Sequence, residues 1–191
     1  MAWAAVGPVP EAPFLPADRR VSLADVPLAG CPPWLGVDRA LAGWEAWRTL
    51  RQGVLVADAG TVLSLTLVDG SGTFRGGRLM AGVGLQLAAM AEGTVLLPRV
   101  SPQGRPAGAA EKDDWPTATA EAMRVGVETG LAAAVVEAAS QASGCQRLVL
   151  TGGDALRLEG RITSAVAEFG VRTSHRPLLC LESLVNLRPE R

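Results

Sequence analysis

The segment LVADAGTVLSLTLVDGSG, Leu55–Gly72, carries the pattern that decides the fold. An apolar run ends at Asp58, passes through Gly60, and resumes at Thr61 as a second apolar run. Two such runs joined by a short glycine turn predict antiparallel strands in a hairpin. The turn itself has two interpretations. Asp and Gly are common turn residues, but this set also suits a phosphate and cation site, because small residues admit a phosphate and Asp binds hard cations.

The sequence on either side extends the hairpin into a mixed α/β pattern. Apolar residues at three- and four-residue spacing predict a helix over 37–50, ended by Gly53. A short third strand begins at Phe74 and leads through a glycine turn into a helix over 83–92. Three consecutive strands with short connections predict an antiparallel meander.

The second half of the chain adds alternating strands and helices. A long amphipathic helix is predicted over 119–143. A strand ending in Gly-Gly and a helix follow within 146–170, and a last strand and helix lie within 176–187. The resulting βββαβαβ order in an α/β domain is typical of the ribonuclease-H-like unit.

The first 35 residues do not form a domain of their own in this interpretation. Short strands are expected within 3–10 and 19–28, separated by proline-rich joints, and two short strands cannot bury a sheet face. We expect residues 1–35 to be the carboxyl-terminal remnant of a preceding ribonuclease-H-like domain, and residues 36–191 to be a second such domain.

The composition predicts a folded protein and argues against several functions. Of 191 residues, 48% are hydrophobic and 19% are charged, which supplies a core and is too little charge for disorder. The net charge of −1 gives no electrostatic basis for binding nucleic acid. No apolar run reaches the roughly 18 residues of a membrane span, and the amino-terminal residues lack the basic region of a signal peptide. We therefore expect a cytoplasmic protein that binds neither nucleic acid nor membranes.

The cysteines and the histidine form no metal-binding pattern. Cys31, Cys145 and Cys180 include no CxxC pair, and His175 is the one histidine. This set cannot supply a zinc cluster, and it fits a reducing compartment. We expect three ordinary buried thiols and a histidine on the surface.

Further candidate site residues lie at helix starts and in glycine-rich segments. Asp38, followed by Arg39, stands at the start of the first helix, where it would be a helix cap or, aimed at a substrate hydroxyl, a general base. Thr119 has the same cap interpretation at the start of the long helix. The segment 72–82 holds four glycines, which suits close approach of the backbone or only a bent strand and a turn. The segment 151–155 follows a buried strand and would receive a nucleotide or cap the following helix.

Six short blocks in a fixed order resemble one known family. Over about residues 20–160 the chain resembles the type III pantothenate kinases, which belong to the acetate and sugar kinase/Hsc70/actin superfamily of actin-like ATPases. The blocks are LGVDRALA (35–42), VADAGTVLSLTLVD (56–69), GGRLMAGVGLQL (76–87), GTVLLP (93–98), TATAEAMRVGV (117–127) and LVLTGGDA (148–155).

The resemblance implies an activity and its requirements. Members of this family use ATP to phosphorylate pantothenate to 4'-phosphopantothenate, the first step of coenzyme A biosynthesis. They need ATP with Mg²⁺ and a monovalent cation, K⁺ or NH₄⁺. They are homodimers with the pantothenate site at the subunit interface.

The resemblance also implies roles for single residues. The G-x-D-R motif of the family matches Gly36, Val37, Asp38 and Arg39. On that basis Asp38 would take the proton from the attacking hydroxyl, while Arg39 and the adjacent backbone of Gly36 and Val37 would hold pantothenate.

The D-x-G-T motif gives roles to the hairpin turn. It matches Asp58 to Thr61, so that Asp58 would bind the monovalent cation while Gly60 and Thr61 would contact ATP phosphate. Thr119 matches a threonine that touches pantothenate. The resemblance therefore favours the phosphate and cation interpretation of the turn over simple chain reversal.

The chain departs from the family pattern in three places. The D-x-G-N-T phosphate loop that begins the family has no match, the chain has no tyrosine where the family has one against the substrate, and Ala81 replaces a usual proline. Cys31 or Trp34 lies in the region of the tyrosine. Three explanations remain open: the native protein is longer, the chain is an inactive homologue, or it is a non-catalytic dimeric binding or regulatory protein.

Overall fold

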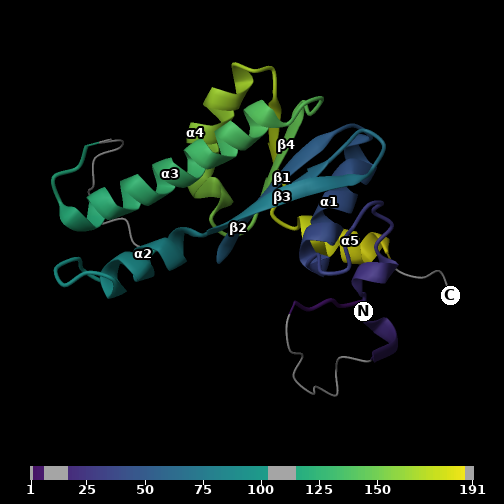
Figure 1. Ribbon diagram of the computed structural model, residues 1–191, viewed down its shortest axis with the longest axis horizontal. Helices are drawn as coiled ribbons and strands as arrows, with labels where there is room; N and C mark the ends of the chain where they lie inside the picture. Colours follow the sequence, from purple (N-terminus) through teal and green to yellow (C-terminus); the bar gives the residue numbers. More distant parts are fainter. Residues whose placement is uncertain (1, 7–16, 103–114, 188–191) are drawn as a thin grey trace.

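One mixed sheet with helices on both faces organises the molecule (Figure 1). The computed structural model describes residues 2–6, 17–102 and 115–187. The strands stand in the order β3-β2-β1-β4-β5. The first three pair as an antiparallel meander, and β4 and β5 continue the sheet in parallel from β1. The strands are β1 Val54–Ala59, β2 Val62–Val68, β3 Phe74–Ala81, β4 Arg147–Thr151 and β5 Arg172–His175.

The helices divide between the two faces of the sheet. The α1 and α5 helices cover one face and share a core with Val54 and Val56 of β1. The α3 and α4 helices cover the other face, where Leu55 and Ala57 of β1 point. This division follows from the alternation of side chains along a strand. The helices are α1 Val37–Leu50, α2 Val83–Glu92, α3 Thr119–Gln141, α4 Ala155–Ala167 and α5 Leu179–Asn186, and two 3₁₀ helices span Ala17–Arg19 and Leu23–Asp25.

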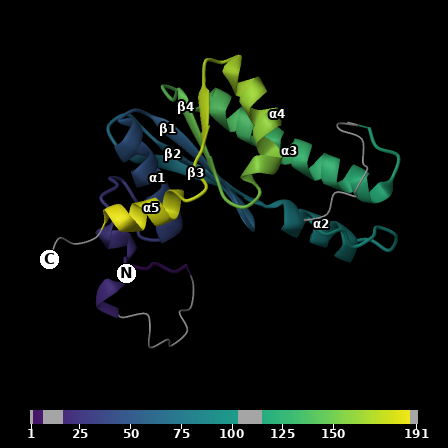
Figure 2. The same ribbon diagram turned by 180° about the vertical axis from the view of Figure 1, so that it is seen from behind.

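The predicted order of helices and strands after residue 36 is confirmed. The first helix and the 83–92 helix have the predicted bounds, and α3 begins at Thr119 as predicted. The α2 and α3 helices extend together beyond the end of the sheet as an arm (Figures 1 and 2). Within the described residues, none of the helices combines the length and the hydropathy that a bilayer span requires.

The glycine turn predicted before α2 is wrong. Gly76 and Gly77 lie inside β3, which continues to Ala81 as the longest strand of the sheet. Gly77 allows close approach here, because a Cβ at this position would collide with the carbonyl oxygen of Leu65 and the guanidinium of Arg39. Gly77 thus serves packing within a strand, which local sequence alone does not distinguish from a turn.

The predicted amino-terminal strands are also wrong where the structure describes them. Residues 19–28 contain 3₁₀ turns, because the Asp25 carboxylate accepts hydrogen bonds from the backbone N–H of Ser22 at 2.8 Å and from its hydroxyl at 2.6 Å. Such local bonds compete with strand pairing. Trp3 makes an isolated bridge to Arg20. The rest of the first predicted strand, over 7–10, lies outside the described residues.

Three details of the elements differ from the prediction. The α3 helix ends at Gln141 and not at 143. The C-cap that follows Leu50 is Arg51, which adopts the left-handed conformation with φ 53°, and not Gly53. Gly53 instead packs closely, since a Cβ there would lie 3.0 Å from the carbonyl oxygen of Gly144. The last strand covers Arg172–His175, before the segment 176–187 to which it was assigned.

Candidate active site

Two carboxylates lie close enough to influence one another where β1 ends and α1 begins. Asp58 is the next-to-last residue of β1. Its side chain lies on the same face of the sheet as those of Val54 and Val56, the face that α1 covers. Asp38 is the second residue of α1. Burial raises the pKa of Asp58, and the nearby charge of Asp38 raises it further. The fold therefore brings two carboxylates from separate motifs together as a like-charged pair.

Asp38 does not cap its helix. The N-cap of α1 is Gly36, so the cap interpretation is wrong, although the predicted place in the first turn is correct. A Cβ at Gly36 would lie 2.5 Å from Oδ1 of Asp38, which shows that the carboxylate folds back over this glycine. Helix amides and dipole stabilise an anion at this position. Among the described residues no hydrogen-bond donor reaches the carboxylate of Asp38, so its oxygens are open to a ligand.

Polar side chains flank Asp58 within the sheet. Ser64 of β2 and Thr151 of β4 are its pairing partners, so both hydroxyl groups share its face, and both residues are buried. Gly152 adopts φ +90°, and a Cβ there would lie 2.5 Å from Oδ1 of Asp58. Within the part of the chain that the structure describes, no hydrogen bond reaches the Asp58 carboxylate. The result is an oxygen-rich position of the kind that hard cations prefer.

Cys180 of α5 completes this group and was not identified as a site residue from the sequence. Its Sγ donates a hydrogen bond to the backbone oxygen of Asp38 at 3.7 Å. Burial, with the charges of Asp58 and Asp38, raises the pKa of the Cys180 thiol to about 12. The thiol is therefore neutral, half-buried and adjacent to both carboxylates. Its surroundings in the sequence are those of an ordinary core helix, and only the tertiary fold returns that helix to α1.

The hairpin turn lies at the same end of β1. Thr61 is exposed, and its backbone oxygen accepts a hydrogen bond from the N–H of Gly82 at 2.9 Å. A Cβ at Gly82 would collide with the carbonyl oxygen of Gly60. Close packing of this turn against the end of β3 thus explains one glycine of the 72–82 segment. The Thr61 side chain remains open to solvent and to a ligand.

The Arg39 side chain contacts residues of β2 and β3. Its Nε donates to Oγ1 of Thr66 at 3.3 Å, its Nη2 donates to the Leu65 carbonyl at 3.4 Å, and its guanidinium lies 5.8 Å from the Phe74 ring centroid. Burial lowers the pKa of Arg39, while the charge of Asp38 acts to raise it. The side chain contributes a fixed cation to the face of the sheet that carries Asp58.

Thr119 lies apart from the other predicted site residues. It is the first residue of α3, whose N-cap is Ala118, so the cap interpretation of Thr119 is wrong. The α3 helix covers the opposite face of the sheet from Asp58. Its 23 residues span about 34 Å, and its amino end lies far out on the arm (Figures 1 and 2). The fold of one chain therefore does not bring Thr119 to the carboxylate pair.

A cavity of about 140 Å³ opens elsewhere, between β3 and the end of α3. It lies on the α3 face, its apolar floor includes Leu55 and Leu65, and a hydrogen bond from Arg78 to Gln141 runs along its rim. It is therefore separated from Asp38 and Asp58 by the sheet. In the described ranges no group of three or more His, Cys, Asp or Glu side chains could hold a metal ion.

Comparison with known proteins identifies the family. A family model described as type III pantothenate kinase matches residues 29–141, which is more than half of the chain. The chain belongs to the type III pantothenate kinase family. The matched region contains both carboxylates, the hairpin turn and Thr119, whereas α5 with Cys180 lies beyond it.

Several curated relatives carry the family name. A type III pantothenate kinase of Synechococcus elongatus is 42% identical over 125 residues, covering 64% of this chain and 48% of the relative. One from Thermosynechococcus vestitus is 38% identical over 154 residues, covering 79% and 59%. The chain spans about half the length of the curated relatives it matches. A solved structure titled "Alp12 filament structure" is similar at 10% identity and a TM-score of 0.47, covering 71% of this chain and 46% of that one.

Proposed function

We propose that this chain provides the pantothenate-activating half of a type III pantothenate kinase, which transfers phosphate from ATP to pantothenate to give 4'-phosphopantothenate. The observation that carries the proposal is the pairing of Asp38 with Asp58 at the end of β1. In the reaction, the Asp38 carboxylate accepts the proton of the primary hydroxyl as that oxygen attacks phosphorus. General-base catalysis of this kind contributes roughly 10²- to 10⁴-fold to a rate.

Asp58 is proposed as the ligand of the monovalent cation, K⁺ or NH₄⁺. Two neighbouring carboxylates without donors are costly, and a bound cation would offset their repulsion. The hydroxyls of Ser64 and Thr151 stand beside Asp58 and supply further oxygen ligands. These residues fit a monovalent cation, which favours oxygen ligands over thiolate or imidazole. Mg²⁺ would arrive bound to ATP, where it neutralises phosphate charge.

The remaining site residues are proposed to position the two substrates. The amide of Gly60 and the exposed hydroxyl of Thr61 would contact ATP phosphate, since backbone amides and hydroxyls are ordinary phosphate ligands. The backbone of Gly36 and Val37, together with Arg39, would hold pantothenate beside Asp38. Positioning and neutralisation of charge supply most of the catalysis in phosphoryl transfer.

Thr119 is proposed to act from a second copy of the chain in a cytoplasmic homodimer. It cannot reach Asp38 within one chain, because it lies on the far end of the arm and on the other face of the sheet. An arm that extends from the body is suited to placing its tip against a neighbouring subunit. In the same proposal residues 36–191 form a ribonuclease-H-like domain of the actin-like type, and residues 1–35 are the end of a preceding one.

The decisive test is ATP-dependent phosphorylation of pantothenate by the 191-residue chain with Mg²⁺ and either K⁺ or NH₄⁺. Turnover that Asp38→Asn lowers at least about a hundredfold, with pantothenate binding retained, supports the proposal. Unchanged turnover in Asp38→Asn would remove Asp38 as the base. Pantothenate binding by calorimetry without any turnover would instead support the non-catalytic binding or regulatory role.

A further inference from the structure

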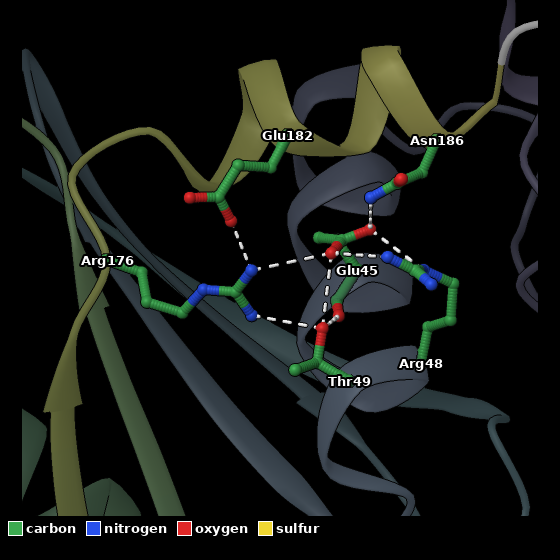
Figure 3. Close-up of polar contacts among 6 residues, drawn as sticks. All are labelled: Glu45, Arg48, Thr49, Arg176, Glu182 and Asn186. Atoms are coloured by element: carbon green, nitrogen blue, oxygen red, sulfur yellow. Dashed lines mark hydrogen bonds and ion pairs between the residues drawn. The ribbon is translucent and has the colours of Figure 1, made fainter.

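A second polar cluster lies on α1, two turns beyond Asp38, and none of the site assignments uses it. At its centre is Glu45, whose side chain is 2% exposed. Arg48 donates to both carboxylate oxygens at 2.9 and 3.0 Å, Asn186 donates at 3.0 Å, and Arg176 donates at 3.4 Å (Figure 3). The hydroxyl of Thr49 also donates to this carboxylate, at 3.1 Å. We call this group, with Glu182, the Glu45 cluster.

The Glu45 cluster joins segments that are far apart in the sequence. Arg48 belongs to α1, as does Glu45 itself, whereas Arg176 lies between β5 and α5 and Asn186 ends α5 (Figure 3). Arg176 makes three of the links, because it pairs with Glu45, donates to Thr49 at 3.2 Å and pairs with Glu182 of α5. The cluster therefore fastens the beginning and the end of α5 to α1.

The same two helices meet again at the carboxylate pair. Cys180, near the start of α5, contacts the backbone of Asp38, near the start of α1. Asn186, at the end of α5, contacts Glu45, seven residues after Asp38. The helices therefore run side by side in the same direction, and residues seven apart share a helix face. Any shift of α5 along or away from α1 would change the contact between Cys180 and the backbone of Asp38.

We propose that the Glu45 cluster is a positioning clamp that holds α5 as a cover over the Asp38–Asp58 pair. Arg176 and Glu45 are its positioning residues, and neither touches the reacting atoms. Where it concerns turnover, the inference rests on the proposed kinase function. The clamp limits water around the carboxylates on the α5 side and fixes the backbone of Asp38, because buried charge-assisted bonds are strong and directional.

Arg48 and Arg176 form a matched pair of probes for the clamp. Both guanidinium groups bind the same carboxylate, so Arg48→Met and Arg176→Met each remove one positive charge from Glu45. Only Arg176 ties α1 to the segment that starts α5. If the cluster is a clamp, Arg176→Met should loosen α5 more than Arg48→Met does. If only the charge around Glu45 matters, the two variants should loosen α5 equally.

The first readout is the labelling rate of Cys180 by a maleimide in the full chain, with Cys31→Ser and Cys145→Ala as background. Cys180 lies on the side of α5 that faces Asp38, so its labelling reports movement of α5 away from α1. We expect Arg176→Met to label roughly tenfold faster than the background and Arg48→Met to label at nearly the background rate. Removing a positive charge does not favour the thiolate, so faster labelling reports opening and not a more reactive thiol.

The second readout is the split between kcat and KM. We expect Arg176→Met to lower kcat several-fold with little change in KM for ATP, and Arg176→Lys to restore part of both kcat and Cys180 protection. Equal labelling of the two methionine variants would overturn the clamp, even if both were less stable by thermal melting. If the background chain has no kinase activity, the proposed function fails while the labelling comparison still decides whether the clamp exists.

Discussion

Glu45 and Asp58 are two carboxylates on the same side of the sheet, and the protein treats them in opposite ways. Burial alone would raise the pKa of Glu45, but hydrogen bonds from Arg48 and Asn186, the charge of Arg48, and a bond from Thr49 outweigh it and lower the pKa. Burial also raises the pKa of Asp58, where no described donor compensates and Asp38 adds a second negative charge. Protein groups donate hydrogen bonds to the Glu45 carboxylate, whereas the Asp58 carboxylate receives none from the described residues.

This difference is what we expect between a residue that stabilises the fold, Glu45, and one that binds a ligand, Asp58. A carboxylate whose lone pairs are filled by protein donors has no capacity left for a substrate or a cation. A half-buried carboxylate without donors destabilises the empty protein, and such residues gather at functional sites. The comparison can therefore be tested by removing each group and recording the sign of the change in stability.

Glu45→Ala should cause the largest loss. It leaves Arg48 and Arg176 without their shared partner, and breaking a buried ion pair in this way costs about 3–5 kcal/mol of unfolding free energy. Urea unfolding measures the loss. The control is Glu182→Ala, which removes a more exposed partner of Arg176 and should cost about 1 kcal/mol or less. Equal losses would mean that Glu45 is not the centre of the cluster.

Gly152→Ala should have the next largest effect, because this glycine makes room for Asp58. Its φ of +90° is strained for alanine, and the new Cβ would lie 2.5 Å from the Ala59 carbonyl oxygen and from Oδ1 of Asp58. We expect a loss of about 2–3 kcal/mol. Gly153→Ala is the matched control, since a Cβ there meets nothing within 4 Å. A harmless Gly152→Ala would show that the end of β4 does not pack against Asp58.

Asp58→Asn should stabilise the protein without ligands, the opposite sign to Glu45→Ala. The raised pKa means that Asp58 costs stability when ionised, so the gain is full above its folded pKa and disappears as the pH falls toward 3.8. Thermal melting at pH 7 and at pH 4 measures this change. Glu45 behaves in the reverse way, since its stabilisation is complete above about pH 4.5 and is lost on acidification. Addition of K⁺ should stabilise the wild type more than Asp58→Asn.

Ser183→Ala should give the smallest change and a slight gain. The Ser183 hydroxyl is fully buried on α5 and has no hydrogen-bond partner among the described residues. Removing an unsatisfied buried hydroxyl recovers its desolvation cost, about 0.5–1 kcal/mol after the loss of packing. Ser164→Ala, at an exposed hydroxyl bonded to the Gly160 carbonyl, should be nearly neutral in the same urea experiment. A clear loss in Ser183→Ala would indicate a partner such as ordered water.

Local pattern was sufficient for the order of elements, whereas the resemblance to the family was needed to favour Asp38 and Asp58 as site residues over a helix cap and a turn. The helix with Asp38 in its first turn and the strand that ends near Asp58 follow from short-range periodicity. The third strand was expected at Phe74, but its length through Gly76 and Gly77 was not, because glycine indicates a turn locally and the close approach of Gly77 to β2 exists only in three dimensions. The nearness of the two carboxylates follows from the packing of α1 against the sheet, which a single sequence does not reveal.

The residues of α5 that lie near the site could not be predicted either, because their contacts also join segments that are distant in the sequence. Cys180 bonds to a backbone oxygen 142 residues earlier, and Asn186 bonds to Glu45 across 141 residues. Nothing in the local sequence of α5 distinguishes it from any short amphipathic helix. Glu45 likewise has the local pattern of a solvent-facing helical acid with an arginine three residues later. Only the fold makes these residues a cluster and a cover.

The distance along the chain between α1 and α5 has a consequence for protein synthesis. Ribosomes add about 5–20 residues per second, so roughly 7–28 seconds separate the emergence of Glu45 from that of Asn186, 141 residues later. Early in this interval β2 and β3 emerge and can pair with β1 in the antiparallel meander. The side of α1 that α5 will cover stays exposed until the interval ends. The nascent chain thus presents an apolar surface with a half-satisfied acid, which is where we expect chaperones to engage it.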